Sequence, residues 1–138
     1  MIVLDTNVLS ELVKPRPDPL VVDWLSSQDQ SDLYISTLTV AEMLFGALQM
    51  HEGVRADSKA EVILEVLARY HRKTLAFDML AASECANIRS LRGSAGRPIA
   101  LADAMIAAIA VAAEADAIAT RDKDFADVGL PVVNPWAA

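Results

Sequence analysis

Met1-Ile2-Val3-Leu4-Asp5 opens the chain, an apolar run that ends in a carboxylate. A short run of this kind is typical of a strand buried inside a parallel sheet. Ala117–Thr120 is a second such run, and Asp122 follows it after one intervening residue. Functional groups of an open parallel sheet gather where its strands end. Asp5 and Asp122 are therefore expected to share one crevice.

Strand-like and helix-like segments alternate along the rest of the chain. Strands are expected at 1–4, 33–36, 75–77, 117–120 and 132–133. Helices are expected at 8–13, 20–28, 40–48, 62–70, 79–91 and 101–113, with a cap at Thr37 or Thr39, a turn at 53–59 and breaks at Gly93, Gly96 and Pro98. This alternation predicts an α/β fold with a parallel sheet of four or five strands, covered by helices on both faces.

Composition narrows the class of protein. The 138 residues fit a single domain, 1–138, and 54% hydrophobic with 22% charged residues is the profile of a globular protein. The net charge of −7 argues against broad, non-specific binding of nucleic acid. Cys85 has no internal partner, which favours a reducing cytoplasm. The apolar run 104–113 is too short for a membrane span, and no basic targeting region precedes the first strand.

Asp103 needs an explanation, because it is the only polar residue between Ile99 and Ala113. Either it lies in the first turn of a helix, where free N–H groups favour an anion, or it binds a metal ion. Glu42 taken alone is typical of a solvated acid in a first helical turn. Carboxylates that converge raise one another's pKa, and Mg²⁺ or Mn²⁺ relieves the repulsion. The isolated histidines, His51 and His71, do not suggest zinc.

An acidic metal pocket without a Ser or Cys nucleophile constellation suggests phosphodiester hydrolysis. Four motifs in the same order resemble the PIN-domain family, in particular its VapC/FitB toxins. They are Asp5-Thr6-Asn7, Thr39-Val40-Ala41-Glu42, Leu101-Ala102-Asp103-Ala104 and Ala119-Thr120-Arg121-Asp122-x-Asp124-Phe125. The resemblance covers essentially the whole chain and implies a three-layer α/β/α sandwich.

The resemblance also assigns roles to the acids. Asp5 and Asp103 would ligate Mg²⁺ (or Mn²⁺) directly, and Glu42 and Asp122 would bind a second metal ion or a water molecule on the metal. Thr6 or Asn7, and Thr120, would orient carboxylates or water by hydrogen bonds. Asp124 is interpreted as a loop or helix-cap acid. Weaker candidates for substrate contact are Arg92, Arg97, Arg121 and Lys123.

The activity that the resemblance implies is that of a metal-dependent endoribonuclease, the toxin of a type II toxin–antitoxin pair. Its partners would be an RNA substrate, a cognate antitoxin that blocks the groove, and a second copy in a homodimer. DNA would be reached only through the antitoxin.

Three alternatives stay open. A haloacid-dehalogenase-type phosphatase also begins with a strand that ends in Asp, but it needs a second Asp where this chain has Asn7. A receiver domain needs an adjacent acidic pair, and Asp5 has no acidic neighbour. A catalytically silent PIN-like module for dimerisation and partner binding is the alternative from a different class, although such a module has no need of Asp103 in an apolar helix.

Overall fold

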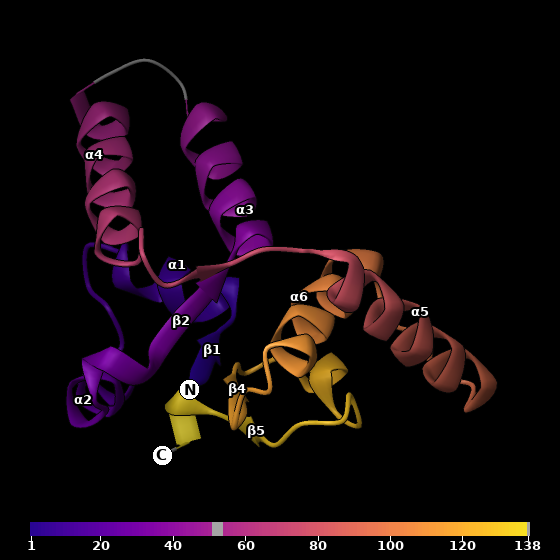
Figure 1. Cartoon of the computed structure of the whole chain (residues 1–138). Helices are drawn as coiled ribbons and strands as arrows, with labels where there is room; N and C mark the ends of the chain where they lie inside the picture. The colour runs from indigo at the N-terminus through magenta and orange to yellow at the C-terminus, as the bar shows by residue number, and fades with distance from the viewer. Residues whose placement is uncertain (51–53, 138) are drawn as a thin grey trace.

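A sheet of five parallel strands forms the centre of the computed structural model, which describes residues 1–50 and 54–137 (Figure 1). The strand order is β3-β2-β1-β4-β5. Parallel strands are joined by crossovers, so helices cover both faces of such a sheet. The bounds are β1 Ile2–Leu4, β2 Leu33–Ser36, β3 Thr74–Leu75, β4 Ala117–Ala119 and β5 Val132–Val133. The three-layer α/β fold predicted from the sequence is confirmed.

Six α-helices of the described residues flank the sheet, with α4 packed against α3 and α5 packed against α6. In Figure 1, α3 and α4 stand side by side as a hairpin, and α5 and α6 lie on the other side of the strands. Three short 3₁₀ helices complete the elements. The bounds are α1 Thr6–Leu12, α2 Pro19–Ser27, α3 Thr37–Leu48, α4 Val54–Arg69, α5 Met79–Ser94, α6 Leu101–Ala112, η1 Gln30–Asp32, η2 Lys123–Phe125 and η3 Pro135–Ala137.

Adjacent residues of the central strands point to opposite layers. Val3 and Ile118 belong to an apolar cluster with the alanines of α6, whereas Leu4 and Ala119 belong to a second cluster with residues of α1 to α4. All four side chains are fully buried. A strand that is buried on both faces needs apolar residues at every position, which explains the uninterrupted apolar runs. No helix among the described residues is long and apolar enough to cross a membrane.

Some helix ends differ from the sequence prediction. Ser36 caps α3, accepting a hydrogen bond from Thr39 N at 3.0 Å, so the predicted caps at Thr37 or Thr39 were wrong. The turn predicted at 53–59 is helical from Val54 onward, while Gly53 and His51 lie outside the described residues.

The predicted helix break at Gly93 was also wrong. Helix α5 continues through Gly93 to Ser94, and Gly96, with φ of +71°, follows its C-cap. Glycine tolerates this left-handed conformation just beyond a helix end. A side-chain pattern locates the apolar face of a helix, but its end depends on backbone conformation.

Candidate functional site

Asp5 lies where β1 ends and α1 begins, at the carboxyl edge of the sheet. Its Oδ1 caps α1 by accepting a hydrogen bond from Thr6 N at 2.7 Å. Its Oδ2 accepts a hydrogen bond from the Thr120 hydroxyl, also at 2.7 Å. Only 5% of the residue is exposed. Asp5 is thus held in one orientation by a helix N-terminus and by the neighbouring strand.

Thr120 follows β4 and connects three polar groups of the site. Its hydroxyl donates to Asp5, accepts from Asn7 Nδ2 at 2.8 Å and accepts from Asp122 N at 3.0 Å. Because β1 and β4 are adjacent and parallel, the residues that follow them meet at one edge. The structure therefore brings Asp5 and Asp122 to one edge, as the strand ends predict, and places Asn7 and Thr120 between them.

Asp103, Asp122 and Asp124 form a second group of carboxylates. Each offers an oxygen, and these oxygens all lie within 4.8 Å of one another. Asp103 lies in the first turn of α6, which confirms the first of the two explanations offered by the sequence. Asp122 is the cap of η2 and accepts from Asp124 N at 2.9 Å. Asp124, interpreted from the sequence as a loop or helix-cap acid, has a carboxylate oxygen close to those of Asp103 and Asp122, so it is added to the candidate ligands.

Glu42 reaches the site from α3. Its Oε1 lies 3.2 Å from the Thr6 hydroxyl, which also lies 3.2 Å from the hydroxyl of the buried Thr39. Thr39 in turn contacts the helix cap Ser36. A polar chain therefore runs from Ser36 at the end of β2 through Thr39 and Thr6 to Glu42. Ser36 and Thr39 were not predicted from the sequence as residues of the site.

One open hollow of about 330 Å³ is lined by the carboxylates of Asp5, Glu42, Asp103 and Asp122. Burial, followed by the charges of Asp122, Glu42 and Asp124, raises the pKa of Asp103. Burial also raises the pKa of Asp5 from 3.8 to about 6, although the hydrogen bonds from Thr120 and Thr6 oppose this. The residues around the hollow are Asp5, Thr6, Asn7, Ser10, Glu11, Lys14, Glu42, Asp103, Arg121 and Asp122.

The donor set fits a hard divalent cation. Carboxylate oxygens are the preferred ligands of Mg²⁺ and Mn²⁺, and a cation would relieve the repulsion that raises the pKa of Asp103. Asn7 Oδ1 is buried and has no hydrogen-bond partner in the described part of the chain. A buried oxygen without a partner is costly, and a water molecule or hydrated ion in the hollow would supply one.

The basic residues proposed for substrate contact fall into different environments. Arg92 is buried, and its guanidinium donates to the carbonyl oxygens of Arg97, Asp124 and Ala126. Its contacts therefore tie α5 to the segment that carries the acids. Arg97 pairs with Asp127 at the surface.

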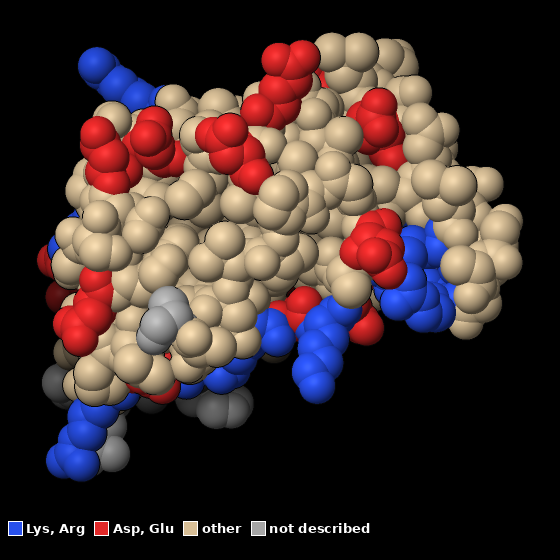
Figure 2. All heavy atoms as spheres, turned by 90° about the horizontal axis from the view of Figure 1, so that it is seen from below, with Lys and Arg blue, Asp and Glu red and all other residues tan. Residues whose placement is uncertain are grey.

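The other two candidates are exposed. Arg121 lines the acidic hollow and lies over the ring of Trp136, 4.7 Å from its centroid. Lys123 opens η2 beside the acids. Figure 2 shows lysines and arginines interspersed with acids on the face seen from below, without a continuous basic patch over the described residues.

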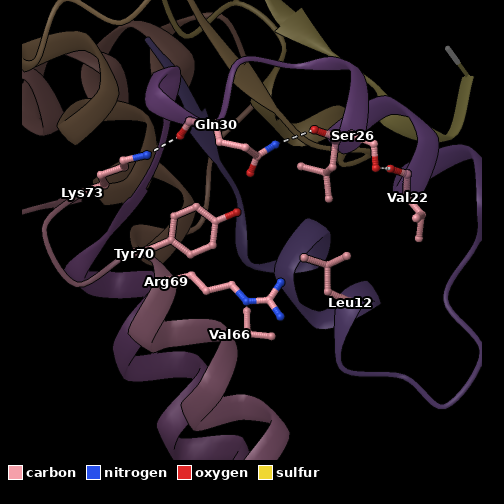
Figure 3. A pocket seen from close by; sticks show the side chains of 9 residues that line it. Leu12, Val22, Ser26, Gln30, Val66, Arg69, Tyr70 and Lys73 are labelled. Atoms are coloured by element: carbon pink, nitrogen blue, oxygen red, sulfur yellow. Dashed lines mark hydrogen bonds between the residues drawn. The ribbon is translucent and has the colours of Figure 1, made fainter.

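A larger hollow, of about 420 Å³, lies between α1, α2 and the end of α4. Figure 3 shows Arg69, Tyr70 and Lys73 on its wall, with the Lys73 ammonium donating to the Gln30 carbonyl. No carboxylate lines it. The acidic hollow at the sheet edge is therefore the candidate for metal-assisted chemistry.

Comparison with known proteins identifies the family. A model described as PIN domain matches residues 2–130. The VapC ribonuclease Y4jK of Sinorhizobium fredii is 41% identical over 99% of this chain and 98% of its own. Toxin FitB of Neisseria gonorrhoeae is 38% identical over 99% of both chains. The solved structure of FitAB bound to a DNA fragment has a TM-score of 0.92 at 39% identity, covering 99% of this chain and 96% of that one. The chain belongs to the PIN-domain family and is a homologue of the VapC and FitB toxins.

Proposed function

We propose that this protein is a metal-dependent endoribonuclease and the toxin of a toxin–antitoxin pair. The observation that carries the proposal is the convergence of acids from distant segments on one hollow. Asp5 follows β1, Glu42 comes from α3, Asp103 from α6 and Asp122 from the segment after β4. The homologues called VapC ribonuclease and toxin FitB support the same activity.

Several of these acids would ligate the metal ion together. Asp103, Asp122 and Asp124 have mutually close oxygens, and Asp5 lines the same hollow. A divalent cation there would polarise the scissile phosphate and lower the pKa of the attacking water. Thr120 fixes the orientation of Asp5 through its hydroxyl. Glu42 is exposed at the mouth of the hollow and can accept a proton from water.

The first experiment is cleavage of a structured RNA by purified, antitoxin-free protein with Mg²⁺, Mn²⁺ or EDTA. Asp5→Asn and Asp103→Asn should each abolish cleavage, because each removes a carboxylate charge from the hollow. Asp23→Asn is the matched control, since it makes the same chemical change at an exposed acid on α2 that does not line the hollow. Absence of cleavage in every metal, with the protein folded, would favour the silent partner-binding module.

The partner proteins are also part of the proposal. The solved structure of FitAB bound to a DNA fragment supports an antitoxin partner. We propose that this antitoxin occupies the acidic groove and carries the contact with DNA. We further expect a homodimer, because Phe45 and Leu48 on α3 and Met79 and Leu91 on α5 are largely exposed. Aromatic side chains and methionine, here Phe45 and Met79, are enriched at protein–protein interfaces. Sedimentation equilibrium of the toxin alone should give twice the chain mass, and a monomeric mass would contradict this expectation.

A further inference from the structure

Two basic side chains also line the acidic hollow, and the proposed metal-binding role of the acids gives them no function. Lys14 and Arg121 line the hollow together with Asp5, Asp103 and Asp122. We refer to these two cations as the cationic rim. The whole chain has a net charge of −7, so these two cations are opposite in sign to the net charge of the protein.

Lys14 is held in place by a buried carboxylate. Its ammonium donates to Glu11 Oε2 at 2.7 Å, while the other oxygen, Oε1, accepts from Asp18 N at 2.9 Å. Only 4% of Glu11 is exposed, whereas 49% of the Lys14 side chain is. A charged pair between two exposed residues is usually loose, because two long side chains must be held in one geometry. Here the carboxylate is already held by burial and by Asp18 N, so only the lysine side chain must be ordered. The Lys14 ammonium is therefore fixed at the mouth of the hollow and still open to solvent.

Arg121 lies on the same side. Its guanidinium stacks over Trp136, which restricts it, and its charge is close enough to help lower the pKa of Glu11. The larger cause of that lowered pKa is the hydrogen bond from Lys14. Glu11 thus lies near both cations. Asp103, by contrast, lies near the negative charges of Asp122, Glu42 and Asp124, which help to raise its pKa. The hollow has a carboxylate side and a cationic side.

We propose that Lys14 is an RNA-phosphate contact and that Glu11 is the positioning residue that aims it. The proposal rests on the ribonuclease function proposed above and names how the substrate is held. A divalent metal ion held by the carboxylates would neutralise the charge of the scissile phosphate. The neighbouring phosphates would still face an acidic surface, and an ammonium fixed at the rim would attract one of them.

The test uses RNA affinity as a function of salt. An RNA hairpin that the wild-type protein cleaves is labelled and titrated with Asp5→Asn protein, which should bind without cutting. In this background Lys14→Gln and Lys59→Gln are compared, and each replacement removes one positive charge. Lys59 lies on α4, exposed and away from the hollow, so it controls for net charge.

The plot of log affinity against log salt has a negative slope. Losing one contact with a phosphate in the single-stranded loop of the hairpin should make this slope less steep by about 0.7. We expect this for Lys14→Gln and not for Lys59→Gln. In active protein, Lys14→Gln should raise KM by roughly three- to tenfold with little change in kcat, because the contact is made equally in ground and transition states. Lys14→Arg should restore most of the affinity.

Glu11→Gln tests the positioning role. Removing a negative charge near RNA would by itself lower KM. If Glu11 aims Lys14, KM should instead rise by a few fold, while the salt slope stays near that of the wild type because the ammonium is retained. A fall in KM would overturn the positioning role.

The outcomes separate this proposal from the proposed function. RNA cleavage with equal slopes for Lys14→Gln and Lys59→Gln would overturn the phosphate contact and leave the nuclease intact. A protein that neither cuts nor binds RNA would overturn both.

Discussion

Burial of Asp5 should make the metal-free protein less stable as the pH rises. Its pKa in the folded protein is about 6, against 3.8 for the ordinary carboxyl, with burial as the largest cause. The folded state therefore favours the protonated form. Below about pH 4, Asp5 is protonated in both states and does not lower the free energy of unfolding. As the pH rises through 6, the unfolded chain gains more from ionising this carboxyl than the folded protein does, so the free energy of unfolding falls.

The magnitude follows from the size of the shift. One pKa unit corresponds to about 1.4 kcal/mol, so a shift from 3.8 to about 6 is worth about 3 kcal/mol when complete. Between about pH 4 and about pH 7.5 most of this is lost, about 2 to 3 kcal/mol. For a domain of this size the loss lowers the Tm by several degrees.

The assay compares wild-type and Asp5→Asn protein in EDTA by urea unfolding at several pH values. Asparagine has nearly the same shape but does not titrate. The difference in unfolding free energy, variant minus wild type, should rise by about 2 to 3 kcal/mol from about pH 4 to about pH 7.5. The substitution also changes the hydrogen bond with Thr120, but this adds a constant to the difference at every pH. It therefore does not affect how the difference changes with pH.

A difference that stays flat within about 0.5 kcal/mol would refute the reasoning, since it would mean that Asp5 ionises as it does in water. Saturating Mg²⁺ should also remove most of the pH dependence in the wild type, because the cation favours the charged carboxylate.

Three further outcomes are expected. Thr120→Val removes the hydroxyl that contacts Asp5, Asn7 and Asp122, and it should weaken Mn²⁺ affinity by about 10- to 100-fold in calorimetry, with unchanged affinity contradicting the positioning role. Arg92→Met leaves three carbonyl oxygens without their buried donor. It should lower the free energy of unfolding, measured in urea, by about 3 kcal/mol, whereas a loss below about 1 kcal/mol would mean that water replaces the guanidinium. Asp124→Asn should weaken metal affinity about tenfold, because this carboxylate lies with Asp103 and Asp122, and an unchanged calorimetric titration would place Asp124 outside the metal site.

Local patterns in the sequence predicted most of the architecture. The alternation of apolar strands and amphipathic helices is a short-range property, so β1, β2, β4 and β5 were placed within a residue. The same reasoning placed Asp5 and Asp122 together, because parallel strands end at one edge. The resemblance to PIN domains supplied the fold family and the roles of the four acids.

The tertiary structure decided which partner each polar side chain has. Thr120 and Asp5 are 115 residues apart in the chain, and no periodicity predicts their hydrogen bond. Asp124 joins the cluster because the short turn of η2 places it there, and the buried Arg92 donates hydrogen bonds to the carbonyl oxygens of Asp124 and Ala126 in that segment. Residue type and spacing reveal the face on which a side chain lies, but the pairing of charges depends on distances between elements that only packing sets.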